Sequence, residues 1–321
     1  ALTLVGAAQA GSATAAAAGK GPQQIAEVKE ESPFDKIWSL FSLYKNDANP
    51  FLEELNFTGR YQGQYYNIDG DKSSDEDWDH RRFRLGLKAK MLDKKLSLNA
   101  EIFSELNPGG EFYAGFKNLN LSYKFSDEFN VKVGKLEPEF TYDYSMSDTL
   151  HIFFDRNVLV NQFKNDYSTG ISLFGKSGKW SYEIAATSNT PGKEFGELNG
   201  GWSTTGFISY DLKEALSVDK AVWRFDFMHS EHDDNDTLMT GFDNGLATSF
   251  EFKQGATGLV SEVIAGFGNS NNVGLILTPT YDITKKLQFV GRYTLALSDE
   301  DNGQNPQKRY QSYVGAPKGD V

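Results

Sequence analysis

The chain has 321 residues, a formal net charge of −12 and no cysteine. Its acidic balance argues against nucleic acid as a partner, because proteins that bind nucleic acid carry basic surfaces. The mean hydropathy is −0.49, and no apolar run reaches the roughly eighteen residues that a membrane-spanning helix needs. These features exclude a helical membrane protein but not a transmembrane β-barrel, in which only alternate residues meet lipid.

Residues 1–10 have the pattern of a signal-peptide remnant. A short apolar stretch, Leu2–Val5, leads into Ala8-Gln9-Ala10, which is a small-x-small cleavage pattern. We therefore predict an exported protein. The alternative is an ordinary N-terminus that is rich in alanine.

Residues 11–50 form a second predicted region, a leader rich in Ala, Gly, Gln, Lys and Glu. Within it, Pro33–Tyr44 places apolar residues at i, i+3, i+4 and i+7. This spacing predicts a short amphipathic helix. A short strand that leads into the next region is the alternative.

In the third region, residues 51–321, apolar and polar residues alternate with the period of two that strands have. The clearest example is Arg81–Met91. One of its faces is apolar, and the other carries a row of cations: Arg82, Arg84, Lys88 and Lys90. Like charges on one strand face repel each other. The row therefore favours a wall with lipid outside and an anion-carrying channel inside over a soluble sheet.

About fourteen such strands are predicted, each of the length that tilted membrane strands need. Short turns alternate with longer, mostly acidic links, which is the arrangement of an outer-membrane barrel. The turns are Leu92–Lys95, Phe125–Glu128, Lys176–Lys179 and Asp282–Lys285, and the acidic loops are Asp69–Asp79, Glu231–Asp236 and Asp299–Asn302. The predicted fold class is an all-β, antiparallel transmembrane β-barrel. No closing strand follows Tyr310–Val314, so we expect C-terminal strands to be missing.

One segment, Thr141–Lys164, breaks the alternation. It is long and aromatic, and it carries Arg156. Loops of this length are usually functional or disordered, and the apolar content argues against disorder. Our hypothesis is a loop that folds into the pore and narrows it. The alternative is a surface loop that packs on its neighbours.

Four stretches together resemble the phosphate-selective porin O and P family of outer-membrane channels. They are Arg81–Lys88, Val131–Phe140, Phe154–Asn157, and Asp166–Gly175 with the following Trp180–Tyr182. Their order and spacing match over about residues 55 to 300. The resemblance implies a barrel of sixteen strands when complete, a basic lumen, a homotrimer and a place in the outer membrane of a Gram-negative-type bacterium.

Basic residues on the inferred polar faces are the candidate site. An anion that enters a narrow pore loses part of its hydration, and fixed cations must replace that stabilisation. The predicted pore-lining, anion-binding residues are Arg60, Arg82, Arg84, Lys88, Lys90, Lys132, Arg156, Arg224 and Arg292. In the alternative interpretation, lumen acids such as Glu101 and Asp226 pair with some of these cations and leave only weak selectivity.

No catalytic, metal-binding or cofactor motif is present. Asp69–Asp79 fails as an EF-hand because its twelfth position is His80 and not a bidentate Glu. The predicted function is passive diffusion of small hydrophilic solutes through a water-filled outer-membrane channel that favours inorganic anions such as phosphate. The alternatives are a structural or adhesive barrel that anchors the envelope and, with less support, an outer-membrane enzyme.

Overall fold

The computed structural model describes residues 40–69, 74–147, 151–153, 156–163, 166–231, 242–268, 270–301 and 303. The predicted signal remnant and most of the leader lie outside these ranges. In the described part of the chain, no helix has both the length and the apolar character needed to cross a membrane.

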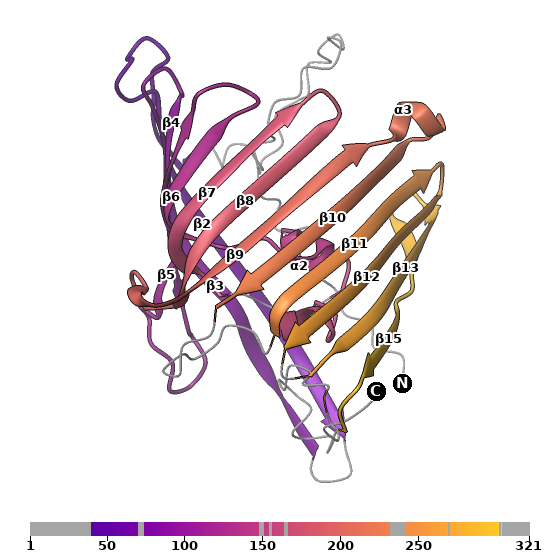
Figure 1. The fold of residues 1–321 in the computed structure, drawn as a ribbon. Helices are drawn as coiled ribbons and strands as arrows, with labels where there is room; N and C mark the ends of the chain where they lie inside the picture. The colour runs from indigo at the N-terminus through magenta and orange to yellow at the C-terminus, as the bar shows by residue number, and fades with distance from the viewer. Residues whose placement is uncertain are drawn as a thin grey trace.

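The described residues form one antiparallel sheet of fifteen strands, which follow one another in chain order from β1 to β14. The strands are β1 (Ser42–Lys45), β2 (Glu54–Asp69), β3 (Ser74–Met91), β4 (Leu96–Ser104), β5 (Gly115–Lys124), β6 (Asn130–Leu136), β7 (Ser168–Ser177), β8 (Trp180–Thr190), β9 (Glu197–Asp211), β10 (Lys220–Ser230), β11 (Phe242–Gln254), β12 (Thr257–Gly268), β13 (Asn272–Thr284), β14 (Leu287–Val290) and β15 (Tyr293–Ser298). The sheet is strongly curved (Figure 1).

The last two strands are pieces of one interrupted strand. β14 pairs with the end of β13, and β15 pairs with its beginning. The break falls at Gly291 and Arg292. Counted in this way, the described residues form fourteen strands, thirteen of them in residues 51–321, where about fourteen were predicted. The all-β, antiparallel fold class is confirmed.

Two expectations about local structure are wrong. Ser42–Lys45 is a strand, so the predicted helix over Pro33–Tyr44 does not reach these residues, and its first part lies outside the described ranges. The predicted acidic loop Asp69–Asp79 is largely strand, because β3 begins at Ser74. There β2 and β3 continue as a hairpin beyond the neighbouring strands (Figure 1). Leu92–Lys95 and Phe125–Glu128 fall between strands as expected, whereas the other two predicted turns overlap strand ends, because β7 extends to Ser177 and β13 to Thr284.

Alternate side chains of the strands face opposite sides of the curved sheet, as the pleat requires. The outer side carries exposed aliphatic residues on strand after strand, for example Leu87, Leu121, Val133, Ile184 and Val263. Such a continuous apolar surface suits contact with lipid. Charged and small polar residues occupy the other side, which faces the lumen.

The chain leaves the sheet after Leu136, at the end of β6, and returns at Ser168, where β7 begins. The β8–β9 loop closes the wall at this place. The Lys135 ammonium donates hydrogen bonds to the carbonyl oxygens of Gly192 and Lys193, and the N–H of Phe116 donates to the latter at 2.8 Å. The wall therefore stays continuous where one strand turns inward.

The described residues of the segment 137–167, hereafter the inward loop, lie within the curve of the sheet. They contain the short helix α2 (Tyr142–Ser145) and the 3-10 helix η1 (Val160–Phe163). Figure 1 places α2 on the inner side of β10–β13. The structure thus agrees with the hypothesis of a loop that folds inward, and not with the alternative of a surface loop.

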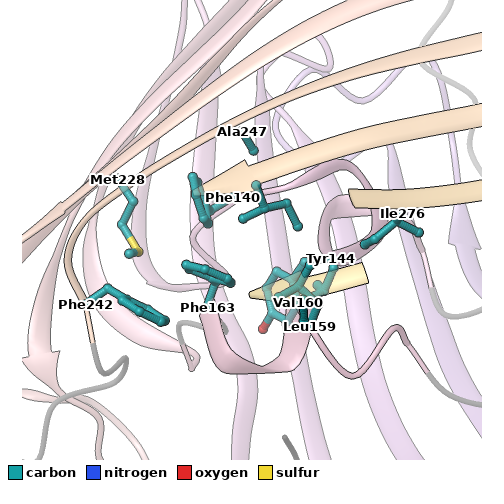
Figure 2. Packing of buried hydrophobic residues seen from close by; sticks show 11 residues of the cluster. Phe140, Tyr144, Leu159, Val160, Phe163, Met228, Phe242, Ala247 and Ile276 are labelled. Carbon is teal, nitrogen blue, oxygen red and sulfur yellow. The ribbon is translucent and has the colours of Figure 1, made fainter. Parts of the chain in front are cut away.

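Apolar packing holds the inward loop against the lumen face of β10–β15. One cluster joins Phe140, Tyr144, Leu159, Val160 and Phe163 of the loop to Met228, Phe242, Ala247, Ile264, Ile276 and Ala296 of the wall. Figure 2 shows the two sets of side chains meeting. The loop residues Leu159 and Val160 have no solvent exposure at all. The main apolar core of the described residues thus lies inside the barrel wall.

Three glycines make room for this packing. A β-carbon at Gly245 would stand 2.7 Å from the ring of Phe140, and one at Gly266 or Gly274 would overlap Phe163 or Leu159. The three glycines lie on the lumen face of neighbouring strands, with Gly245 directly opposite Gly266. Each provides a hollow that one apolar side chain of the loop fills.

This fit makes a testable prediction. The double variant Gly266→Ala with Gly274→Ala should expel Phe163 and Leu159 from their hollows, because overpacking of a close-packed site costs about 1–3 kcal/mol. Chymotrypsin should then cut within the inward loop about tenfold faster, since cleavage follows local opening. Mass spectrometry of a detergent-solubilised digest measures the rate.

Gly59→Ala is the matched control, because a β-carbon there meets only ordinary van der Waals contacts, the nearest at 3.5 Å. Equal cleavage of the double variant and the control would show that the glycine hollows do not hold the loop.

Candidate functional site

A group of three guanidinium side chains occupies the lumen face of β2 and β3. Arg60 and Arg84 are direct cross-strand partners, and Arg82 lies two positions from Arg84 on the same face. The Arg82 Nη1 donates to Gln62 Oε1 at 2.9 Å. Like charges directly opposite each other destabilise a strand pair. The structure therefore brings three positive charges together on one face of the hairpin.

Arg84 shares an acid with a cation that the sequence pattern did not identify. Glu101 Oε1 lies 3.9 Å from Arg84 Nη1 and 3.8 Å from Lys117 Nζ. Alternation along β5 puts Lys117 on the lipid face. A register shift opposite Glu101 and Ile102 turns it into the lumen, because a bulge reverses the alternation of faces. One carboxylate thus faces two cations.

Two lysines continue the basic face toward the short turns. Lys88 is exposed and forms no ion pair within the described residues. Lys90 Nζ lies 3.2 Å from Glu54 Oε2. Acids and cations therefore lie together on this wall, with Glu54 and Glu101 as the partners of Lys90, Arg84 and Lys117.

Lys132 is paired with an acid of the next hairpin. Its Nζ lies 3.3 Å from Glu183 Oε1 and 5.1 Å from the ring centre of Phe174. Ser172 Oγ also donates to the same carboxylate oxygen. The charges of Lys132 and Glu183 nearly cancel, so this pair contributes little to the electrostatic potential in the lumen.

Arg224 lies beneath the inward loop, with 11% of its side chain exposed. Its Nε donates to both carboxylate oxygens of Asp226, at 2.9 and 3.0 Å. Its Nη2 donates to Ser145 Oγ of the loop at 2.8 Å and lies 3.5 Å from Glu139 Oε2. The guanidinium also stacks on Phe207, with 3.8 Å between Cζ and the ring centre. Arg224 therefore ties the loop to the wall.

Of the two remaining predicted cations, Arg156 belongs to the inward loop and Arg292 contacts it. Arg156 Nη2 donates to the carbonyl oxygen of Tyr144 at 3.1 Å, and its Cζ lies 4.4 Å from that ring's centre. Arg292, placed at the break between β14 and β15, stacks on Phe153 at 4.1 Å. Burial, followed by the charge of Glu137, raises the pKa of the Tyr144 phenol well above its ordinary value, so the ring stays neutral.

This arrangement suits ion passage better than bond chemistry. Within the described residues, no group of His, Asp and Glu could hold a metal ion. Guanidinium groups on one wall can replace the hydration of an oxyanion, because each offers two parallel N–H donors.

Comparison with known proteins supports this view. A family model described as phosphate-selective porin O and P matches residues 55–241. The anion-selective porin from Comamonas acidovorans is 10% identical, with a TM-score of 0.55 over 76% of this chain and 79% of that chain. OmpF of Salmonella typhi, solved with daunomycin, is 11% identical, with a TM-score of 0.58 over 83% and 84% of the two chains.

A further solved structure with this fold is the outer-membrane channel DcaP of Acinetobacter baumannii. It is 16% identical, with a TM-score of 0.50 over 80% of this chain and 81% of that chain. Identities this low establish the fold only. The comparison with curated proteins finds no match.

Lipid-facing residues on one side of every long strand and charge on the other make this protein a porin, a channel for small solutes in the Gram-negative outer membrane. The family match covers more than half of the chain. The protein therefore belongs to the phosphate-selective porin O and P family.

The shared acid Glu101 allows a direct test of the basic wall. Glu101→Gln keeps the side-chain shape but removes the negative charge that faces Arg84 and Lys117. The ratio of anion to cation permeability should rise, because the fixed positive charge of the wall increases. The reversal potential in a potassium chloride gradient across a planar bilayer measures this ratio.

Glu214→Gln is the control, because Glu214 lies in the short helix α3 (Lys213–Leu216) at a turn and pairs with Lys179 at 2.7 Å. A fall in the ratio for Glu101→Gln, or an equal change in both variants, would contradict a local role of the β2–β5 wall.

Proposed function

We propose that this porin is a passive diffusion channel that favours small anions, inorganic phosphate among them, over cations. The observation that carries the proposal is the group of Arg60, Arg82 and Arg84 on the lumen face of β2 and β3. Like charges that stand directly opposite each other destabilise a strand pair. An oxyanion that passes between the guanidinium groups can accept bidentate hydrogen bonds from them.

The position of the inward loop supports the same preference. The loop covers the lumen face of β10–β13, where Asp226 and Glu262 have 0% and 2% exposure. These acids are withdrawn from the solute, whereas Arg60 and Arg82 remain half-buried and Lys88 remains exposed. The uncovered wall is therefore the basic one.

The predicted cations take different roles in this proposal. Arg60, Arg82 and Lys88 contact the passing anion, in a series of moderate sites that permit rapid exit, and the buried Arg84, with 9% exposure, adds its charge from within the wall. Lys90 and Lys132 act weakly because Glu54 and Glu183 screen them. The other three, Arg156, Arg224 and Arg292, position the inward loop. The family description as phosphate-selective and the anion-selective Comamonas porin support an anion preference.

The experiment is a reversal-potential measurement on the full chain in planar bilayers. The unmodified protein should show the sign of anion preference in a potassium chloride gradient. The triple variant Arg60→Gln, Arg82→Gln and Arg84→Gln should move the potential toward zero, because three positive charges leave the wall while hydrogen-bonding side chains of similar reach remain.

Lys179→Gln serves as the control. Lys179 lies at the β7–β8 turn, so this substitution removes one positive charge at a place away from the lumen. Equal or cation-favouring permeability of the unmodified protein would refute the anion preference. An absence of open-channel steps would refute the channel itself and favour a structural barrel.

We propose that the working assembly is a homotrimer, which membership in the family supports. Light scattering of the detergent complex, with detergent mass subtracted, should give three times the mass of the chain. A value of one chain mass in several mild detergents would contradict this.

A further inference from the structure

Three carboxylates meet around Arg224 under the inward loop. Asp226 and Glu262 belong to the wall, and Glu139 belongs to the loop. Arg224 donates hydrogen bonds to Asp226, with Nη2 and Oδ1 2.6 Å apart, and it reaches Glu139 at 3.5 Å. Glu262 has a different partner, the loop backbone. Arg224, Asp226 and Glu262 are therefore buried beneath the seated loop, whereas Glu139 keeps 32% of its side chain exposed.

Glu262 fixes the start of α2. Its Oε1 accepts the N–H of Tyr142 at 2.5 Å, and its Oε2 accepts the N–H of Asp143 at 3.4 Å. The first N–H groups of a helix have no partner within the helix, and a carboxylate that accepts them makes strong, charge-assisted hydrogen bonds. Thr141 Oγ1 accepts the next one, from Tyr144 at 3.3 Å.

The strand that carries Glu262 does not depend on this side chain. β12 is paired along its length with β11 and β13 through backbone hydrogen bonds. The described residues of the inward loop form no such backbone pairing with the wall. Loss of the carboxylate therefore acts first on the loop and leaves the wall in place.

We infer that Glu262 is a positioning residue for permeation, which holds the inward loop over the acids of β10–β12 and so sets both the width and the charge preference of the passage. This inference rests on the proposed anion preference. When the loop lifts, the passage widens, and Asp226 becomes accessible to the solute. Conductance then rises while the preference for anions falls.

The sign of the change separates this role from a simple charge effect. Removal of a negative charge from a lumen wall by itself raises anion preference. Glu262→Ala removes the charge and also the two hydrogen bonds to α2, and we expect anion preference to fall by a factor of about two or more, with increased conductance. Glu262→Gln keeps an acceptor oxygen at the same reach and should stay close to the unmodified protein.

Two further variants complete the experiment. Glu262→Asp keeps the charge but shortens the side chain, so it should shift both quantities in the same direction as Glu262→Ala, by less. Asp282→Ala is the matched control: Asp282 is a lumen-facing carboxylate of β13 that pairs with Lys253 at 2.8 Å, near the short turns. It should not increase conductance or lower anion preference.

All variants are measured as full chains in planar bilayers. Each is first shown to be folded by a gel on which heated and unheated samples migrate differently. Unchanged conductance and reversal potential in both Glu262→Ala and Glu262→Asp would overturn the inference, as would a rise of anion preference in Glu262→Ala. If Glu262→Ala fails to fold, Glu262→Asp alone decides the outcome. Failure of the proposed function is distinguishable, because it appears already in the unmodified protein as a missing anion preference.

Discussion

The seating of the inward loop on an apolar part of the lumen wall is the interaction on which the other features depend. Without the loop, Met228, Ile264 and Ile276 would face water inside a barrel whose interior is otherwise polar. Burial of one such side chain contributes about 1.5–3 kcal/mol, and several are buried together. The loop is therefore part of the folded state, and the bore of the channel is fixed when the protein folds.

The charge of the passage follows from this seating. Asp226 and Glu262 lie beneath the loop, where Asp226 pairs with Arg224 and Glu262 accepts hydrogen bonds from the loop backbone. The basic residues of β2–β5 lie outside the loop's cluster. A net charge of −12 for the whole chain is therefore no guide to the lumen. What matters is which charged side chains the loop covers, and that is decided by hydrophobic packing and by the hydrogen bonds of Glu262.

The alternation of residues made the strands, the turns and the two faces predictable, because lipid and water impose opposite requirements on neighbouring positions. Features that depend on a distant partner were not predictable. Gly245 and Gly266 make room for side chains of the inward loop, which becomes evident only when the loop is in place. From the sequence alone, a glycine inside a strand indicates only a weakened strand. Lys117 was missed because one bulge reverses its face, and the β2–β3 hairpin was misread because exposed strands and loops are equally polar.

The same limit applies to the candidate site. Sequence alternation identifies which cations face inward, but partners lie on other strands: Glu183 is opposite Phe174 and not Lys132 in register, yet its carboxylate reaches Lys132. Arg60 and Arg84 are different, since they face each other directly. They lie on the longest hairpin of the sheet, with strands of 16 and 18 residues. Extensive backbone pairing allows this hairpin to tolerate repulsion that a shorter one would relieve by slipping or fraying.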